Sequence, residues 1–261
     1  MNIDYKGKLV IVLGATDGIG KGIALSFARQ GAILLIVGKD SQKLKQLLNE
    51  ISRLNSQKHE YLQVDFREHN NAPSIINNYY RDKTGVVDVL VNNSCNNTLT
   101  SNIIGADNNK FIKDFANYII PFNEFVNHSV KLMKKQSSGR IINILATSAH
   151  KPYQGLAISN TIHGALSTWG KTLALELAPF NITVNNILVG IIITERQKKI
   201  IKELIKNSKY TIDDFLKEKK NEIPLKRFGE VKDVANAVSF LCSEHASYIT
   251  GTELPINGGV M

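Results

Sequence analysis

The strongest constraint on the fold of this chain is a regular alternation of short apolar runs with longer amphipathic stretches. Seven runs have apolar centres and the length of strands: 8–14, 32–38, 60–65, 87–92, 139–145, 182–188 and 252–258. The stretches between them repeat apolar residues at helical spacing: 19–30, 41–54, 107–136, 155–179 and 231–243. Buried strands covered by helices on both faces have this pattern. The sequence therefore predicts an α/β domain with a doubly wound parallel sheet of about seven strands.

The composition gives no reason to divide the chain or to place it in a membrane. No Pro-, Gly- or Ser-rich linker interrupts the 261 residues, so we interpret residues 1–261 as a single domain. The first apolar run is too short to span a membrane and no cleavage site follows it, which predicts a cytoplasmic protein. The net charge of +9 is spread through amphipathic stretches, which argues against a nucleic-acid partner. Cys95 and Cys242 lack metal-ligand spacing, so we expect reduced, buried thiols and no metal site.

A glycine-rich turn joins the first predicted strand to the first predicted helix. In such a turn Gly14 permits the chain reversal, Gly18 lets the backbone approach a pyrophosphate, and Gly20 lets helix and strand pack closely. The N–H groups and the positive dipole at the start of the helix then hold the phosphates. The turn therefore predicts a dinucleotide site formed by Gly14, Thr16, Asp17, Gly18, Ile19 and Gly20.

The end of the second predicted strand bears on the choice between NADP and NAD. An NAD site usually has a carboxylate there for the adenosine ribose, whereas this chain reads Gly38-Lys39-Asp40. Gly38 removes the acid that would repel a 2′-phosphate, and Lys39 supplies a cation beside it. Asp40 is interpreted as the N-cap of the following helix. We expect NADP, with NAD as the alternative if Lys39 is an ordinary surface lysine.

Further segments, together with the glycine turn, resemble the short-chain dehydrogenase/reductase family over essentially the whole chain. The segments are VDF (64–66), VNNSC (91–95), NYIIPF (117–122), IPLKRFGEVKDVANAVSFL (223–241) and SYITGTELPINGGVM (247–261). The resemblance implies a Rossmann-type sheet that binds a nicotinamide dinucleotide. It places Asp65 and Phe66 near the adenine, and Asn92 and Ser94 along the cofactor. Cys95 stands where the family has a glycine.

The catalytic segment departs from the family. In the family a tyrosine transfers the proton, a serine binds the substrate oxygen, and a lysine lowers the pKa of the tyrosine and holds the nicotinamide ribose. An asparagine completes a water-linked proton relay. By resemblance Asn117 matches the asparagine, but Ala146 stands at the serine position, Ser159 at the tyrosine position and His163 at the lysine position. Three of the four catalytic groups are replaced.

One interpretation is a reductase with altered catalytic groups, carried by Asn117, Ser159 and His163. Ser159 and His163 lie four residues apart on the predicted helix and therefore face the same side. We expect His163 to titrate near neutrality and to donate the proton, directly or through Ser159 and a water, or to bind the nicotinamide ribose. Neighbouring side chains are further candidates to polarise the substrate oxygen or donate the proton: Thr147, Ser148, His150 and Tyr153.

Two other interpretations stay open. The chain is a catalytically inactive NADP(H)-binding protein that acts as a subunit, sensor or scaffold, which the loss of three catalytic groups favours. In the last interpretation Ser159 and His163 are the nucleophile and base of a hydrolase. This is the weakest of the three, because no orienting carboxylate and no nucleophile-elbow context accompany them.

The segment 191–223 corresponds to the family's substrate lid and is long here. Its apolar residues predict one or two amphipathic helices, and its lysines attract an acidic or thioester-carrier substrate unless they are simply solvated. The predicted partner is a small-molecule substrate. By resemblance to the family, the helices at 107–136 and 155–179 form the interface of a homotetramer or homodimer.

Overall fold

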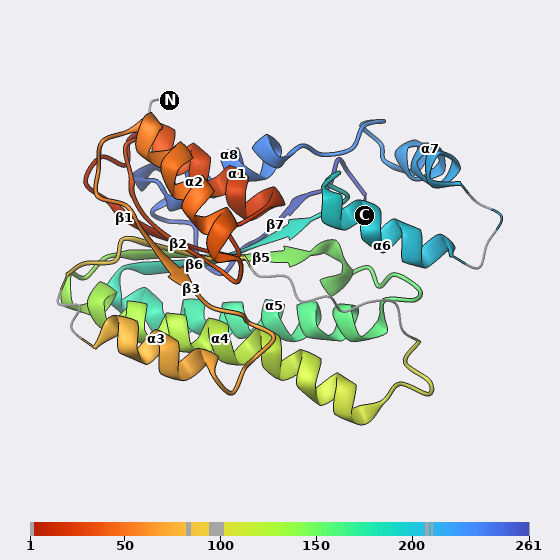
Figure 1. The fold of residues 1–261 in the computed structure, drawn as a ribbon, viewed down its shortest axis with the longest axis horizontal. Coiled ribbons are helices and arrows are strands. Elements are labelled where there is room, and N and C mark those ends of the chain that lie inside the picture. Colours follow the sequence, from red (N-terminus) through yellow and green to blue (C-terminus); the bar gives the residue numbers. More distant parts are fainter. Residues whose placement is uncertain (1–2, 82–84, 94–101, 207–208, 210, 261) are drawn as a thin grey trace.

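The computed structural model describes residues 3–81, 85–93, 102–206, 209 and 211–260. Its centre is a sheet of seven strands that all run parallel, as the sequence predicts (Figure 1). In spatial order the strands are β3 (Glu60–Gln63), β2 (Ile33–Gly38), β1 (Leu9–Leu13), β4 (Val89–Asn92), β5 (Gly139–Ala146), β6 (Ile182–Val189) and β7 (Glu253–Ile256). The strand order reverses between β1 and β4, and ligands of doubly wound sheets bind at the carboxyl edge beside such a reversal.

Helices cover both faces of the sheet. One layer contains α1 (Gly18–Arg29), α2 (Ser41–Leu54) and α8 (Val231–Cys242), and the other contains α3 (Ala72–Tyr80), α4 (Asn108–Lys135) and α5 (Ala157–Leu177) (Figure 1). Successive side chains of β1 alternate between the layers: Val10 and Val12 pack under α1 and α8, whereas Ile11 and Leu13 pack over α4 and α5. Because both faces are buried, β1 and β2 are apolar along their whole length.

The predicted helices agree with the structure to within a few residues, except that α3 was not predicted. This nine-residue helix reads APSIINNYY. Asparagine and tyrosine are poor helix formers, so the segment has little propensity of its own. Its buried residues Ala72, Ile76 and Tyr80 pack against the layer of α4. Tertiary packing therefore stabilises a helix that the local sequence does not indicate.

The predicted amphipathic segment 191–223 forms two helices, α6 (Glu195–Ile205) and α7 (Ile212–Glu222). Thr194 caps α6 by accepting from the Gln197 N–H, and Thr211 and Asp214 form a capping box at the start of α7. A parallel bridge between Ile192 and Gly229 joins the two ends of the segment. Figure 1 places both helices beyond the carboxyl ends of β5 and β7, where a substrate lid is expected.

In the described part of the chain, none of the helices combines the length and apolarity that a bilayer crossing requires. Cys242 is a free, buried thiol at the end of α8, as predicted, and burial raises its pKa above the ordinary range. Cys95 lies outside the described residues.

Candidate functional site

The glycine turn has the strained backbone and close contacts that the sequence predicts. Gly14 and Gly18 have positive φ angles of 62° and 53°, a region that side chains other than glycine rarely occupy. A Cβ on Gly14 would lie 1.9 Å from the Asn93 carbonyl oxygen, and one on Gly20 would lie 2.2 Å from the Gly14 carbonyl oxygen. The turn is therefore restricted to glycine by the neighbouring backbone.

Asn93 holds this turn in place. Its Nδ2 donates to the carbonyl oxygens of Leu13 and Gly14, each at 3.2 Å. Our sequence interpretation assigned the neighbours Asn92 and Ser94 to the cofactor and missed Asn93, although all three lie in one segment. Ser94 lies outside the described residues.

Asp17 caps the helix that follows the turn. Its carboxylate accepts from the Gly18 N–H at 2.7 Å and lies 3.5 Å from the Lys43 ammonium. The Asp17 side chain is exposed. A phosphate group that approaches the start of the helix therefore competes with a solvent-exposed carboxylate for the Gly18 N–H. The positive end of the α1 dipole favours either anion.

A cavity of about 330 Å³ opens between the glycine turn, the ends of β2 and β3, and the start of α6. Eight residues predicted to bind the dinucleotide line it: Gly14, Thr16, Asp17, Gly18, Ile19, Lys39, Asp65 and Phe66. Six further lining residues were not predicted at this site: Lys43, Arg67, Asn93, Thr194, Glu195 and Lys199. The structure therefore brings the separate sequence segments into one concave site at the carboxyl edge of the sheet, and α6 forms part of its wall.

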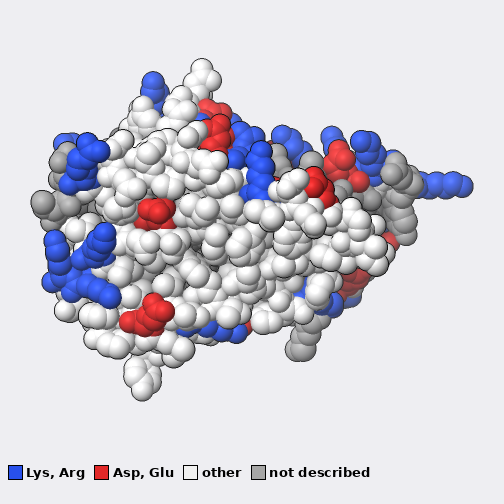
Figure 2. Space-filling model, turned by 90° about the horizontal axis from the view of Figure 1, so that it is seen from below, with Lys and Arg blue, Asp and Glu red and all other residues white. Residues whose placement is uncertain are grey.

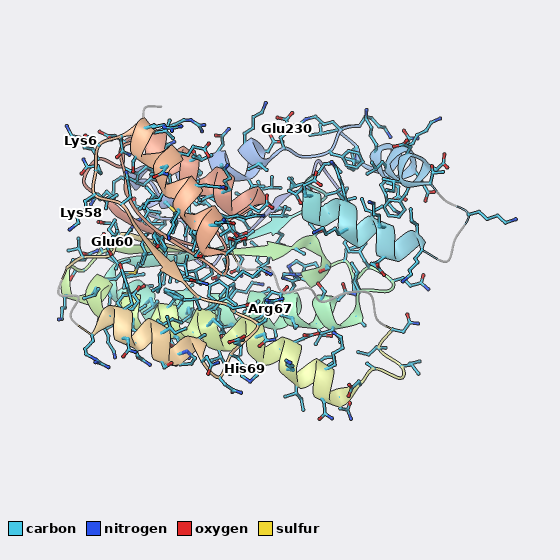
Figure 3. All side chains as sticks on the ribbon, viewed as in Figure 1. Lys6, Lys58, Glu60, Arg67, His69 and Glu230 are labelled. Atoms are coloured by element: carbon cyan, nitrogen blue, oxygen red, sulfur yellow. The ribbon has the colours of Figure 1, made fainter. Side chains whose placement is uncertain are left out.

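The side of the cavity at the ends of β2 and β3 contains several cations. Lys39, Lys43 and Arg67 line it, together with Gly38 at the end of β2 and the carboxylates of Asp17 and Asp65. The Arg67 Nε donates to both oxygens of the Asp65 carboxylate, at 3.0 and 3.1 Å, and these bonds hold the pKa of Asp65 below its usual range. Arg67 thus compensates the one acid at the end of β3. Figure 3 shows Arg67 far from Lys6 and Lys58, which lie at the opposite end of the sheet.

Asn92 lies outside the cavity lining, in a ladder of buried side-chain amides across the sheet. Its Nδ2 donates to Asn143 Oδ1 at 2.8 Å, and Asn143 Nδ2 donates to Asn186 Oδ1 at 2.9 Å. The ladder ends where Asn186 Nδ2 donates to the Ser167 carbonyl oxygen on α5. A Cβ on Gly170 would lie 2.3 Å from Asn186 Oδ1, so this glycine makes room for the ladder. The amides fix the height of α5 over the sheet.

His163 lies on α5 beside the end of β5. The Ala146 N–H donates to His163 Nδ1 at 3.4 Å, which leaves the ring proton on Nε2. Burial lowers the pKa of His163 to about 4. Our expectation that His163 titrates near neutrality is therefore wrong for this structure. The imidazole is desolvated, and this desolvation alone lowers its pKa. At pH 7 it is a neutral hydrogen-bond donor.

Asn117 is buried near the middle of α4. Its Oδ1 lies 2.8 Å from His69 Nδ1, a contact between α4 and the segment after β3. Pro121 follows one helical turn later and has no N–H, so it cannot supply the usual α-helical hydrogen bond to the Asn117 carbonyl. The proline therefore keeps the main chain at Asn117 open to other donors.

The other candidates, Thr147 and Ser148 to polarise the substrate oxygen and His150 and Tyr153 to donate the proton, follow Ala146 in the chain. Thr147 and Ser148 are buried in a short 3₁₀ helix, η1 (Thr147–Ala149), directly after β5. Tyr153 OH lies 3.3 Å from Thr147 Oγ1, and His150 Nε2 lies 2.9 Å from Glu253 Oε2. Ser159 is half-buried on α5, one turn before His163.

Comparison with known proteins agrees with this arrangement. Residues 14–261 match the family model described as Enoyl-(Acyl carrier protein) reductase. The chain is 34% identical over 264 residues to 3-oxoacyl-[acyl-carrier-protein] reductase FabG of Aquifex aeolicus, and the alignment covers 100% of both proteins. The chain belongs to the short-chain dehydrogenase/reductase family.

Two other family members support the same assignment. NADPH-dependent reductase BacG of Bacillus subtilis is 28% identical over 97% of this chain and 98% of its own length. The crystal structure of L-sorbose reductase from Gluconobacter frateurii, complexed with NADPH and L-sorbose, has a TM-score of 0.90 and 28% identity, and covers 100% of this chain and 98% of that chain. The seven-stranded Rossmann-type fold predicted from the sequence is therefore confirmed.

Proposed function

We propose that the chain is an NADP(H)-dependent oxidoreductase of the short-chain dehydrogenase/reductase family that acts on a carbonyl or alcohol substrate with altered catalytic groups. The observation that carries the cofactor part of this proposal is the cavity at the carboxyl edge. It combines a turn restricted to glycine with Lys39, Lys43 and Arg67, and has Gly38 in place of an acid. Backbone amides for a pyrophosphate and cations for a 2′-phosphate are what NADP requires.

Different residues of the site bind different parts of the dinucleotide. The turn from Gly14 to Gly20 receives the pyrophosphate, and Asp65 with Phe66 borders the adenine. Lys39 receives the 2′-phosphate, and Lys43 and Arg67, which also pair with Asp17 and Asp65, add positive charge beside it. His163 offers its Nε2–H to a hydroxyl of the nicotinamide ribose. The bound dinucleotide supplies the hydride that a carbonyl carbon accepts.

We assign Asn117, Ser159 and His163 to the catalytic corner. Neutral His163 cannot act as the family's lysine does, because it has no charge with which to lower the pKa of a neighbouring hydroxyl. Its role is then to orient the ribose and Ser159. The main-chain carbonyl of Asn117, which Pro121 leaves without its helical donor, can hold a water in the proton relay.

A catalytically inactive NADP(H)-binding subunit, sensor or scaffold is the second candidate. It is favoured by the methyl group of Ala146 at the serine position and by the neutral state of His163. The cofactor cavity fits both candidates equally well. Catalysis therefore has to be measured separately from binding.

NADPH oxidation against a carbonyl panel separates the two candidates. Diacetyl, L-sorbose and acetoacetyl-coenzyme A are suitable probes, because relatives of this chain are named for diacetyl, L-sorbose and 3-oxoacyl substrates. The reductase predicts measurable turnover by the wild-type protein with at least one probe. Tight NADPH binding without turnover, and activity gained only in the triple variant Ala146→Ser, Ser159→Tyr, His163→Lys, would instead establish the inactive binder.

The lid and the assembly belong to the same proposal. We propose that α6 and α7 cover a small-molecule substrate. Several of their lysines already pair with acids of the same helix, including Lys198 with Glu195 and Lys219 with Glu222, which reduces their attraction for an acidic substrate. The rest of the proposal is a cytoplasmic protein without membrane or nucleic-acid partner.

We further propose a homodimer or homotetramer formed through α4 and α5. Figure 2 shows the molecule from below, the side on which α3, α4 and α5 lie in Figure 1, and the middle of this face carries few charged side chains. Ile112 of α4 and Leu175 of α5 are 67% and 80% exposed in the single chain. Exposed apolar side chains of this size are typical of a surface covered by a second subunit.

A further inference from the structure

The loop that leads into α5 carries a tyrosine held at both backbone groups. Asn160 Nδ2 donates to the Tyr153 carbonyl oxygen at 2.9 Å, and the Tyr153 N–H donates to Asn160 Oδ1 at 3.4 Å. Asn160 directly follows Ser159, the position at which the family has its catalytic tyrosine. The single amide side chain therefore fixes the backbone of Tyr153 beside that position.

The hydroxyl of the same tyrosine reaches the other half of the catalytic corner. Tyr153 OH lies 3.3 Å from Thr147 Oγ1. Thr147 directly follows Ala146, the serine position, and the Ala146 N–H bonds His163 Nδ1. Tyr153 is half-buried. Tyr153 is thus held through its backbone at the start of α5, and its hydroxyl lies beside η1, directly after the end of β5.

The other side chains nearby are less suited to donate a proton. Tyr118 of α4, whose ring lies 6.0 Å from the ring of His163, is a second phenol but is buried, with only 2% of the residue exposed. His163 is neutral and its Nδ1 is already an acceptor. The Ser159 hydroxyl is an alkyl alcohol and far too weak an acid. The Ser148 hydroxyl is buried, and His150 is held by Glu253 at the surface. A phenol has an ordinary pKa of about 10 and is the strongest neutral acid among these hydroxyl groups.

We propose that Tyr153 is the catalytic proton donor of this protein, that Thr147 shares the hydrogen bond to the substrate oxygen, and that Asn160 is the positioning residue. This rests on the reductase function proposed above. In the reduction, the carbonyl carbon receives a hydride from the bound dinucleotide and the π electrons move onto oxygen. That oxygen takes the proton of Tyr153, and the phenolate regains a proton from water. In this proposal the acid of the family is not lost with the substitution at Ser159, because Tyr153 takes its role from another position.

The test compares Tyr153→Phe with the matched control Tyr248→Phe, since Tyr248 is fully exposed and remote from the corner. With the panel carbonyl that the wild type reduces fastest, Tyr153→Phe lowers kcat on the order of 100-fold, the contribution of a general acid. The dissociation constant of NADPH, measured by its fluorescence, stays within about twofold. Tyr248→Phe changes neither quantity.

Asn160 is tested by a separate readout. Asn160→Ala lowers kcat with little change in KM and speeds amide hydrogen exchange in residues 150–156, while Asn160→Asp, which keeps the acceptor for the Tyr153 N–H, recovers part of both. A Tyr153→Phe variant as active as the wild type, with activity lost in Ser159→Ala, overturns the proposal and leaves the reductase intact. A wild type that binds NADPH but reduces no carbonyl of the panel overturns the reductase, and this proposal with it.

Discussion

The cofactor cavity and the catalytic corner of this protein lie on the same edge of the sheet, yet they differ in how closely they match the pattern of the family. The cavity is formed largely by backbone features: the glycine turn, the start of α1 and the ends of the strands. In the proposed alignment with the family, the catalytic corner has Ala146, Ser159 and His163 at the positions of the family's serine, tyrosine and lysine.

The difference follows from how each region works. Binding of a pyrophosphate depends on the course of the main chain, which the whole core of the domain maintains. Proton transfer depends on one or two side-chain atoms, and a single substitution removes them without changing the fold. A chain can therefore keep its cofactor while its acid moves or disappears.

The largest expected effect breaks the cavity while leaving the corner alone. In Gly20→Ala the new Cβ would lie 2.2 Å from the Gly14 carbonyl oxygen. The turn has to shift to relieve a clash of this kind, which costs about 1–3 kcal/mol, and a loss of the same size in binding lowers NADPH affinity by roughly 5- to 150-fold. Gly85→Ala is the matched control, because a Cβ there meets nothing within 4 Å. Equal affinity of the two variants in a fluorescence titration would show that the turn does not hold the phosphates.

A second measurement tests the state of the corner. Burial lowers the pKa of His163 from 6.5 to about 4. Between these values the unfolded chain binds a proton that the folded protein does not, so acidification from pH 7 to pH 4.5 lowers the free energy of unfolding. The loss attributable to His163 is about 2 kcal/mol at roughly 1.4 kcal/mol per pKa unit.

Urea unfolding at the two pH values measures this loss. His163→Gln removes the titrating group, so its unfolding free energy falls less on acidification than that of the wild type. His245→Gln, at an exposed histidine, keeps the wild-type difference. An unchanged pH dependence in His163→Gln would mean that His163 accepts a proton in the folded protein and is available as a cationic acid.

The smallest effect sharpens the assignment of the cavity to NADP. Lys39→Gln and Arg67→Gln each remove one cation from the proposed 2′-phosphate site. Because each partly exposed charge contributes about 1.4 kcal/mol, we expect a loss of about tenfold in NADP⁺ affinity for each variant. Affinity for NAD⁺, which lacks this phosphate, stays the same. Lys58→Gln, at the opposite end of the sheet, changes neither affinity (Figure 3), and a parallel loss of both would place the cations elsewhere on the dinucleotide.

The sequence predicts most of the cavity lining because each of its elements has a recognisable pattern within a short stretch of sequence. The strand before Gly14, the helix after Gly20 and the Gly38-Lys39 pair each have a pattern that can be recognised without knowing the neighbours. Asn93 was missed because its role depends on a contact between neighbouring strands, with the Gly14 carbonyl. Arg67 was missed although its partner, Asp65, lies only two residues before it. The basic residue two positions after Asp65 is a signal that could have identified Arg67.

The corner is harder to predict, because its chemistry depends on tertiary surroundings. The four-residue spacing of Ser159 and His163 places both on α5, but only the packed structure shows that the imidazole is desolvated. The two hydrogen bonds between the Asn160 side chain and the Tyr153 backbone join residues that are seven positions apart. Because they involve backbone atoms of Tyr153, they leave no pattern in the sequence. Helix α3 was missed for a similar reason, since packing rather than propensity stabilises it.

The most direct test of the whole account is a paired titration of the purified wild-type protein with NADPH and NADH, followed by dinucleotide fluorescence and by thermal unfolding. The account predicts saturable NADPH binding with an upward shift of Tm, and weaker binding of NADH by about tenfold or more, since the cations of the cavity meet no 2′-phosphate. No fluorescence change and no thermal shift with either dinucleotide at millimolar concentration would contradict it.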